Sequence, residues 1–333
     1  MSSTKVTMRT LGKSKLQVTE VGLGCWQLGG DFGPIDESKA TDIVDTALEQ
    51  GIRFFDTADV YGAGQSERYL GQVLSNQPHD TVIATKYGRA QGVFPNNYSF
   101  NSLRDSVLRS QDRLQRDQID LLQLHCVPHE ELQKRHIFDW LEEMKLEGQI
   151  AHYGASVETL EEAKTCLEHA PGLTSLQIIF NLMRQQATTD LFDEAAAKDV
   201  GIIVRLPLAS GMLTGKFDKN TTFDESDHRN FNRNGDAFSV GETFSGIEFE
   251  KGLELVNKLD REFKPNSLKM AQFAMRWILD HNAVSTIIPG ASSPSQVTQN
   301  AAVSAIAPLD EALHKKLYTF YQQDIAPAIR CPV

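Results

Sequence analysis

The sequence of 333 residues has no long run of apolar residues and no cluster of lysine and arginine. A membrane-spanning helix needs about 20 consecutive apolar residues, and the polar residues 1–10 contain no apolar signal core. Acidic residues outnumber basic ones by 44 to 33, so nothing favours binding to nucleic acid or to an anionic membrane. We therefore expect a cytoplasmic protein whose partners are small molecules. The sequence does not indicate an oligomeric state.

Cysteine is also scarce. The four cysteines, Cys25, Cys126, Cys166 and Cys331, lie far apart and show neither Cys-x-x-Cys nor zinc-finger spacing. We expect separate reduced thiols and no metal site. The 23 glycines and 12 prolines are too few for a disordered chain, and a 41% hydrophobic composition is enough for a sizeable core.

Short apolar runs alternate with amphipathic segments along the chain. Eight of the runs are candidate strands, at residues 20–24, 53–56, 82–86, 119–125, 150–154, 176–180, 202–206 and 286–288. The first helix is typical of the segments between them: it carries apolar residues with i, i+3, i+4 spacing from Ala40 to Leu48 and stops at Gly51. Ser102 is the expected N-cap of the third helix, which contains Leu103.

Alternation of strand and helix forces parallel pairing, because each helix carries the chain back to the start of the next strand. Eight such units close into a (β/α)8 TIM barrel, and we expect one domain over residues 1–333. The alternative is an open doubly wound sheet. It would place Gly-x-Gly-x-x-Gly after the first strand, and the glycines at 22–30 lack that spacing.

Three segments lie outside the repeat. Residues 6–10 and 16–19 flank a Gly-Lys-Ser turn, which predicts an N-terminal β-hairpin that plugs the bottom of the barrel. The polar stretch 216–250 is long enough to be a lid or a mobile loop. A C-terminal extra helix is predicted from the spacing of Leu313, Leu317 and Phe320.

Titratable residues stand where three predicted strands end. Asp56, Lys86 and His125 close strands two, three and four, and Tyr61 follows Asp56 by five residues. The active site of a (β/α)8 barrel lies at this end of its strands. A lysine ammonium is expected to lower the pKa of a nearby tyrosine, and a carboxylate would hold that lysine in place. With a neutral histidine that binds a carbonyl oxygen, the four groups form an acid–base site.

Several segments resemble the aldo-keto reductase family, in the right order from about residue 8 to 305. Residues 51–62 end in Asp-Thr-Ala-Asp-Val-Tyr-Gly, and residues 121–125 read Leu-Leu-Gln-Leu-His. The segment 207–216 is similar to the loop that binds the cofactor pyrophosphate. Residues 288–300, with Ile-Pro-Gly-Ala at their start, are similar to the loop at the adenosine end.

The resemblance implies roles for these residues. Tyr61 would be the general acid in reduction, Lys86 and Asp56 would tune it, and His125 would orient the carbonyl. A cofactor would lie across the barrel mouth, with its carboxamide near Ser156 and Gln177. The implied cofactor-binding residues are Trp26, Asp56, Ser156, Gln177, Arg205, Pro207, Leu208, Ser210, Gly211, Leu213, Lys216, Gly290, Ser292, Gln296 and Asn300.

The chain departs from the family pattern in three places. Val157 replaces the asparagine that usually follows the serine of strand five, and Arg205 stands where many members have a tyrosine that stacks on the nicotinamide. A guanidinium plane can also stack on an aromatic ring. The adenosine loop offers Ser292 and Gln296 but no cation for a 2′-phosphate. NADP(H) is the expected cofactor, and NAD(H) remains open.

These observations predict an NAD(P)(H)-dependent oxidoreductase. It would interconvert an aldehyde, ketone or sugar hemiacetal and the matching alcohol or lactone, with Tyr61 as proton donor or acceptor. Two alternatives stay open: a cofactor-binding regulatory or sensor protein of the same fold, and a lyase in which Lys86 forms a Schiff base. The substrate cannot be read from the sequence, although the polar stretch 216–250 is compatible with sugars or small hydroxylated aldehydes.

Overall fold

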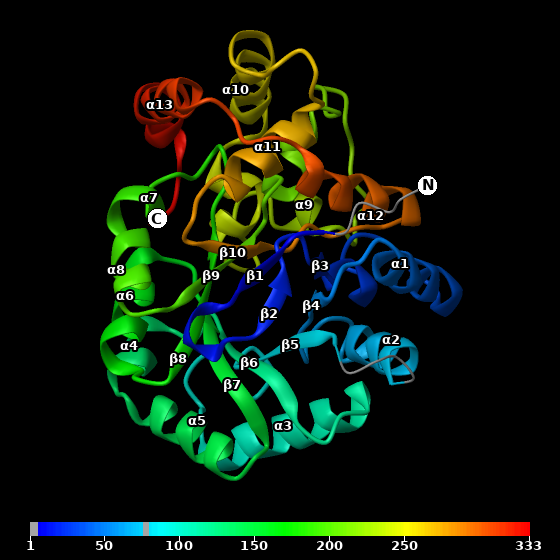
Figure 1. Cartoon of the computed structure of the whole chain (residues 1–333), viewed down its shortest axis with the longest axis vertical. Coiled ribbons are helices and arrows are strands. Elements are labelled where there is room, and N and C mark those ends of the chain that lie inside the picture. Colours follow the sequence, from blue (N-terminus) through cyan, green and yellow to red (C-terminus); the bar gives the residue numbers. More distant parts are fainter. Residues whose placement is uncertain (1–5, 76–79) are drawn as a thin grey trace.

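A computed structural model describes residues 6–75 and 80–333. Its main sheet has eight parallel strands whose spatial order follows the chain. The strands are β3 (Leu23–Gly24), β4 (Phe54–Asp56), β5 (Val82–Tyr87), β6 (Ile119–His125), β7 (Ile150–Ser156), β8 (Leu173–Ile179), β9 (Gly201–Arg205) and β10 (Val284–Ile287). Parallel bridges from Val21 to Ile287 and from Gly24 to Gly290 join the first strand to the last. The predicted (β/α)8 barrel is confirmed (Figure 1).

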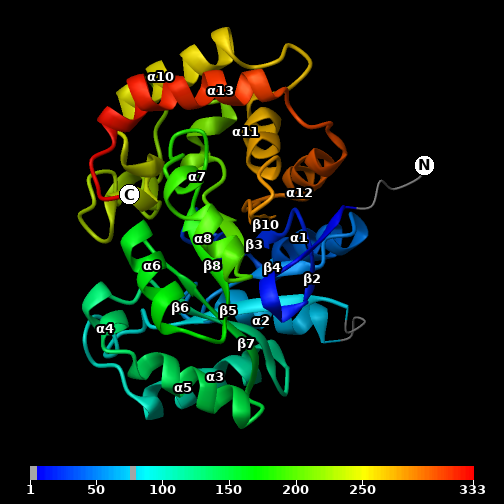
Figure 2. The same ribbon diagram turned by 60° about the vertical axis from the view of Figure 1, so that its left-hand side comes forward.

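Helices surround the barrel in the positions that strand–helix alternation requires (Figures 1 and 2). The helices that follow the strands are α1 (Glu37–Glu49), α2 (Gln65–Leu74), α3 (Phe100–Leu114), α4 (His129–Gln133), α5 (His136–Leu146), α6 (Leu160–His169), α7 (Ala187–Asp190), α8 (Phe192–Ala197), α11 (Met270–Leu279) and α12 (Pro294–Ala301). In α1 the apolar positions of the predicted stripe are buried, among them Ala40, Ile43 and Val44. The helices therefore pack against the sheet through the faces that the sequence pattern marks.

The N-terminal hairpin forms the floor of the barrel, as predicted. Strands β1 (Met8–Thr10) and β2 (Gln17–Thr19) pair antiparallel. Leu11 and Val18 are fully buried and share a cluster with barrel residues such as Phe54 and Leu121. Apolar side chains thus fill the barrel at this end, and a ligand must enter from the other end.

The N-cap assignment of α3 was wrong by three residues. Ser99 is the cap, and its side chain accepts from the backbone N–H of Ser102. The Ser102 hydroxyl in turn accepts from the backbone N–H of Ser99. The two serines form a reciprocal capping box, so Ser102 contributes at the third helical position rather than at the cap.

The predicted loop 216–250 packs against the barrel mouth and contains short helices. These are α9 (His228–Phe231), η4 (Val240–Glu242) and η5 (Phe244–Gly246), and α10 (Phe249–Glu262) begins inside the predicted loop. The C-terminal helix α13 (Glu311–Phe320), which was predicted, lies beside α10 (Figure 2). Phe263 and Phe320 stack there, with ring centroids 5.1 Å apart.

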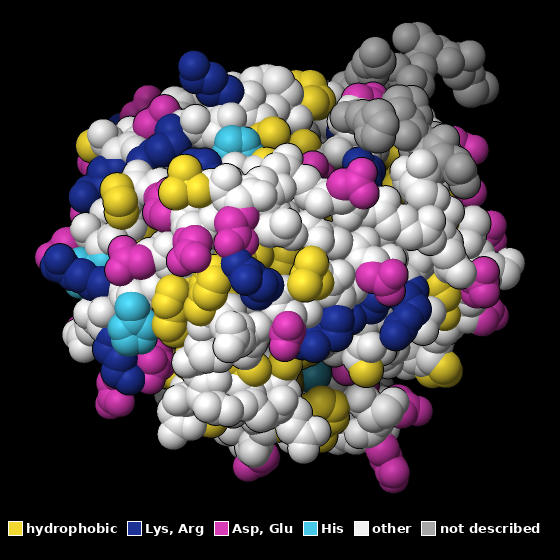
Figure 3. Space-filling view, turned by 90° about the horizontal axis from the view of Figure 1, so that it is seen from below, with side chains coloured by type: hydrophobic (Ala, Val, Ile, Leu, Met, Phe, Trp, Pro, Cys, Tyr) yellow, Lys and Arg dark blue, Asp and Glu magenta, His cyan; other side chains and the backbone are white. Residues whose placement is uncertain are grey.

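The surface agrees with the composition. Figure 3 shows acidic and basic side chains interspersed over one face of the molecule. Within residues 6–75 and 80–333, no helix is long and apolar enough to cross a membrane.

Candidate active site

Three strand ends bring the predicted acid–base residues together. The ammonium of Lys86 donates to the carboxylate of Asp56 at 2.6 Å, to the carbonyl oxygen of Thr57 at 2.7 Å and to the hydroxyl of Tyr61 at 3.3 Å. Lys86 comes from β5, and the other three residues come from β4 and the turn after it. The lysine side chain is 1% exposed, so its charge acts in a desolvated site.

The carboxylate of Asp56 is held from a second side. Its other oxygen accepts from the amide of Gln123 at 2.9 Å and from that of Gln177 at 2.7 Å. Gln177 also accepts a 3.2 Å hydrogen bond from the hydroxyl of Ser156. Gln177 therefore orients the carboxylate, a role that the sequence interpretation did not include.

The predicted effect of Lys86 on Tyr61 is outweighed. Burial raises the pKa of Tyr61 to about 12, and the nearby Lys86 lowers it only in part. Burial opposes the charge of Lys86, but Asp56 and Tyr61 outweigh burial and raise the lysine pKa. The expectation of a lowered tyrosine pKa was wrong for this structure, because desolvation of the phenolate is the larger effect. Tyr61 therefore keeps its proton at neutral pH.

His125 is the neutral group that the sequence predicted. Its ring lies edge-on to the ring of Tyr61, with centroids 5.9 Å apart. Burial, followed by the charges of Lys86, Arg89 and Arg205, lowers the pKa of His125 well below its usual value. Its Nδ1 atom is buried and has no hydrogen-bond partner among the described residues.

Trp26 forms an aromatic wall beside Tyr61. The two rings are nearly parallel, with centroids 5.9 Å apart and an interplanar angle of 21°. The indole N–H donates to the carboxylate of Asp31 at 2.8 Å. Trp26 also contacts the ring of His228 from α9, with centroids 4.8 Å apart. The long loop thus packs directly on a residue of the site.

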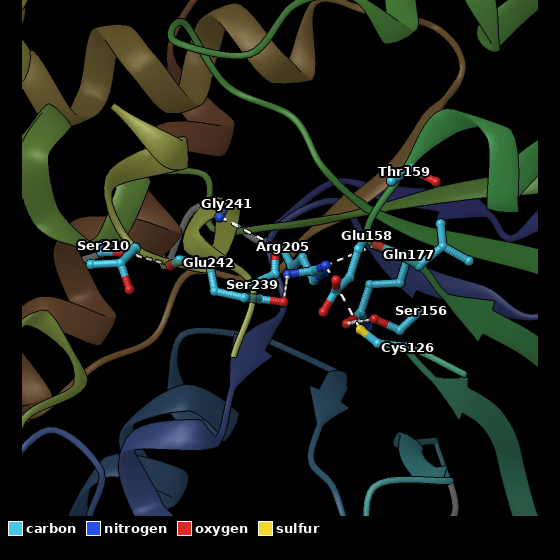
Figure 4. Close-up of polar contacts among 12 residues, drawn as sticks. Cys126, Ser156, Glu158, Thr159, Gln177, Arg205, Ser210, Ser239, Gly241 and Glu242 are labelled. Carbon is cyan, nitrogen blue, oxygen red and sulfur yellow. Dashed lines mark hydrogen bonds and ion pairs between the residues drawn. The ribbon is translucent and has the colours of Figure 1, made fainter. Parts of the chain in front are cut away.

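Arg205, at the end of β9, is held by an ion pair that the sequence interpretation did not include. One terminal nitrogen lies 2.5 Å from the carboxylate of Glu242, and the other donates to the carbonyl oxygen of Val157 at 2.8 Å. Figure 4 shows Arg205 extended between Glu242 and the segment that contains Glu158. Glu242 belongs to η4, so this pair joins the long loop to the barrel.

A second charged group lies next to this pair. Donor atoms of Cys126, Glu158 and Glu242 all lie within 4.8 Å of one another, a spacing that could suit a metal ion. Arg89 pairs with Glu158 at 2.8 Å, and Arg205 pairs with Glu242. Both carboxylates are already neutralised by guanidinium groups, so the cluster is an ion-pair network rather than a cation site.

A cavity of about 540 Å³ opens at the barrel mouth and reaches Tyr61 and His125. Most of the predicted cofactor residues line it: Trp26, Asp56, Ser156, Gln177, Arg205, Pro207, Leu208, Ser210, Gly211, Lys216, Gly290, Ser292, Gln296 and Asn300. Leu213 is the exception, since its side chain is buried and does not line the cavity. Lys86 does not line the cavity and lies against the ring of Tyr61, with its ammonium 4.8 Å from the ring centroid.

The segment after β9 has the backbone of an anion-binding turn. Ser210 and Gly211 have φ values of 54° and 94°, so consecutive residues adopt the left-handed conformation. Such turns can direct backbone N–H groups into a concave surface that suits phosphate. In this turn the N–H of Gly211 already donates to the carbonyl oxygen of Leu208 at 2.9 Å. Lys216 lines the cavity just beyond them. These residues fit the pyrophosphate of a dinucleotide.

Three further cationic residues line the cavity, Arg89, Arg229 and Lys269, and the sequence interpretation assigned none of them. Arg89 follows Lys86 by three residues, in the loop after β5. Lys269 precedes the first residue of α11. The position of Arg89 after a strand end was a usable signal. Nothing local marks Lys269, because a lysine before a helix is common on protein surfaces.

Comparisons with known proteins agree with this fold. The sequence profile described as "Aldo/keto reductase family" matches residues 20–321. The oxidoreductase YqkF of Bacillus subtilis, described as uncharacterized, is 31% identical over 328 residues, which are 97% of this chain and 99% of that protein. L-galactose dehydrogenase of Arabidopsis thaliana is 28% identical, over 90% of this chain and 88% of that enzyme.

Solved structures give the same result. The holo form of the aldo-keto reductase AKR11C1 from Bacillus halodurans superposes with a TM-score of 0.76 at 28% identity, covering 94% of this chain and 96% of that one. The glycerol dehydrogenase AKR11B4 from Gluconobacter oxydans has a TM-score of 0.76 at 26% identity, covering 100% and 98%. The chain belongs to the aldo/keto reductase family.

Proposed function

We propose that this protein is an NAD(P)(H)-dependent oxidoreductase that interconverts an aldehyde or ketone and the corresponding alcohol, with Tyr61 as the proton donor and acceptor. The observation that carries the proposal is the placement of a protonated Tyr61, 3.3 Å from the ammonium of Lys86, on the wall of a dinucleotide-sized cavity. Relatives that are named as dehydrogenases of L-galactose, glycerol and pyridoxal support this class of reaction.

The chain's own groups would handle the proton. A substrate carbonyl next to Tyr61 and His125 would accept the phenol proton as negative charge develops on its oxygen. Lys86, charged and fixed by Asp56, would stabilise the resulting phenolate. Neutral His125 would orient the carbonyl oxygen by hydrogen bonding. A bound nicotinamide would supply or accept the hydride.

NADP(H) is the proposed cofactor, and Lys269 supports it. The loop with Ser292 and Gln296 has no cation of its own, but Lys269 lines the same cavity. A phosphate on the adenosine ribose would find a positive charge there. Lys269→Gln should weaken NADPH binding about tenfold and leave NADH binding within about twofold. Equal loss for both cofactors would argue against this role, and the exposed Lys251→Gln variant is the control.

The Schiff-base alternative is disfavoured by the surroundings of Lys86. A lysine nucleophile must lose its proton and reach the substrate. The ammonium of Lys86 instead makes three hydrogen bonds, is held in its charged form by Asp56, and is 1% exposed.

The defining experiment also tests the sensor alternative. NADPH and NADH are titrated into the protein by fluorescence, and their oxidation by a panel of aldehydes is then followed by absorbance. Binding with turnover supports the proposal. Tight binding without turnover of any carbonyl would favour a sensor, and no binding of either cofactor would remove the oxidoreductase assignment.

A further inference from the structure

The inner part of the cavity carries positive charge that the proposed reaction does not use. The inference below rests on the proposed function and concerns the substrate of the same site. Five cationic residues line the cavity, and Lys216 and Lys269 among them lie near the proposed cofactor segments. The positive charges of Arg89 and Arg205 instead help to lower the pKa of His125, beside which the substrate carbonyl would bind. The chain as a whole has a formal charge of −11, so this local excess of cations is specific to the site.

Three arginines line the cavity, and the two whose charges act on His125, Arg89 and Arg205, differ in their free donors. Arg205 uses both terminal nitrogens, on Glu242 and on the carbonyl oxygen of Val157 (Figure 4). Arg89 uses one terminal nitrogen, Nη2, on Glu158. Its Nε is buried without a partner, and no hydrogen bond of Nη1 occurs among the described residues. The Arg89 side chain is 21% exposed and lines the cavity. Of the two arginines whose charges act on His125, Arg89 is therefore the one with a terminal nitrogen left for a ligand. Arg229, the third arginine of the cavity, is held by Asp227 through Nε and Nη2.

The carboxylate partner of Arg89 leaves that donor open. Among the described residues, Glu158 does not line the cavity, so it holds Arg89 from behind. Arg89 also lies over the ring of Phe94, 5.2 Å from its centroid. An arginine that is fixed on one side by a carboxylate and an aromatic ring loses little entropy when it binds an anion on the other side.

An aromatic part of the cavity lining suits the body of the substrate. Trp26, Phe32 and Phe238 line the cavity together with Val60 next to Tyr61. Trp26 and Phe32 are edge to face, with centroids 5.1 Å apart. A planar or apolar body can pack against this wall while its charged end faces Arg89.

We propose that Arg89 selects carbonyl substrates that carry an oxyanion group, a carboxylate or a phosphate, at the end remote from the reacting carbonyl. Guanidinium binds either group through charge-assisted hydrogen bonds. Arg205 and Glu242 complete the surroundings of the anion without competing for it, because they are paired with each other.

Binding is measured first, because it does not depend on turnover. Calorimetry with the protein and NADP⁺ compares 4-(hydroxymethyl)benzoate with its amide, 4-(hydroxymethyl)benzamide. The carboxylate should bind at least about tenfold more tightly than the amide. Equal binding of the two, or no binding of either, would overturn the proposal.

Turnover then tests Arg89 and the kind of anion. The carboxylate arm compares 3- and 4-carboxybenzaldehyde with their amides, and the phosphate arm compares glyceraldehyde 3-phosphate with glyceraldehyde. Arg89→Gln should raise KM for the preferred anion about 10- to 100-fold, and KM for the neutral partner should stay within about twofold. Arg89→Lys should keep part of the preference. An equal rise for both partners would show that Arg89 shapes the pocket and does not select anions.

A matched control variant separates the expected change in KM from a general effect of removing an arginine from an ion pair. Arg104 also pairs with a glutamate, Glu147, but on the outer helices. Arg104→Gln should leave both KM values unchanged. If neutral aldehydes turn over and anions are not preferred, only this inference fails. If the carboxylate binds preferentially but nothing is reduced, the proposed function fails and the anion site stands.

Discussion

At the scale of single residues, the hydroxyl of Tyr61 is the group on which the proposed reaction depends. Tyr61→Phe removes the proton donor and keeps the ring that packs beside Trp26. We expect the rate of carbonyl reduction to fall about 10²- to 10⁴-fold, with the dissociation constant of the cofactor within about twofold. Steady-state kinetics and fluorescence titration check both values.

The control for this variant is Tyr153→Phe. Tyr153 is also a buried tyrosine, but its hydroxyl binds Glu142 on α5. Its loss should cost some stability and no activity. A Tyr61→Phe variant with the wild-type rate would show that another group protonates the carbonyl.

The pH dependence follows from two shifted groups. The pKa of Tyr61 is raised to about 12, so its proton is present at lower pH and is lost only as the pH rises through that value. The pKa of His125 is lowered well below 6.5, so His125 stays neutral above that pH. Between about pH 6.5 and 9, kcat/KM for reduction should therefore be flat.

Alcohol oxidation, the reverse reaction, should depend on pH in a different way from reduction. Oxidation of an alcohol needs the phenolate, whose fraction rises about tenfold per pH unit below the pKa. Its rate should increase across the same range. A break near pH 7 in the reduction profile would show that a group other than Tyr61 or His125 controls the step.

Residue types at strand ends made most of the site predictable. Asp56, Lys86 and His125 interrupt apolar runs at positions where a barrel places its active site. The sign of the Tyr61 shift was not predictable, because it depends on how completely the fold buries the phenol. Glu242 was missed because charged residues in polar loops are usually solvated and give no local signal, whereas Arg89 was missed although its position just after a strand end was a usable signal.

At the scale of secondary-structure elements, the pair Arg205–Glu242 holds the long loop on the barrel. Both side chains are nearly buried, at 9% and 11% exposure. Glu242→Gln leaves the guanidinium without its charge partner, and we expect a loss of about 3 kcal/mol in the free energy of unfolding. Urea denaturation measures this value.

A double variant distinguishes the loss of the ion-pair attraction from the cost of leaving the Arg205 charge buried without a partner. Replacing Arg205 and Glu242 together with Met and Leu should cost less than Glu242→Gln alone, since no unpaired charge remains. The exposed pair of Lys315 and Glu311 is the comparison, and its loss should leave the free energy of unfolding nearly unchanged. Additive costs at the Arg205–Glu242 pair would argue against a coupled ion pair.

The elements themselves could be predicted where periodicity and end signals agreed. All eight strands were found, but β7 runs on to Ser156, and β8 begins at Leu173, earlier than expected. Polar residues that face the barrel interior or its mouth break the apolar run that marks a strand. The start of α10 within the predicted loop was missed because polar residues precede its first buried turn.

At the scale of the whole molecule, the barrel has a closed end and a reactive end. The hairpin closes one end of the barrel with Leu11 and Val18. The long loop packs over the other end, where its His228 contacts Trp26 and its Glu242 pairs with Arg205. Stability and chemistry are thereby separated along the barrel axis. A substitution in the hairpin should change the free energy of unfolding and leave the rate of the reaction unchanged.

Gly12 in the hairpin turn tests this separation. Its φ is +49°, and a Cβ atom there would lie 2.6 Å from backbone atoms of Thr174, Asp199 and Gly201. These atoms belong to β9 and to the strand and loop next to it, and they cannot move without disturbing the barrel. Gly12→Ala combines a left-handed backbone with overpacking, and should cost about 3 kcal/mol in the free energy of unfolding.

Gly92→Ala is the matched control, because φ is +84° there and nothing lies within 4 Å of an added Cβ. Gly92→Ala has the backbone strain but no steric contact. The difference in unfolding free energy between the two variants therefore measures the cost of the close packing of the hairpin turn against the barrel. At a temperature where Gly12→Ala remains folded, its kcat should equal that of the wild type, since the floor contacts no reacting group. A kcat that falls together with stability would mean that the floor and the site at the mouth are mechanically coupled through the strands.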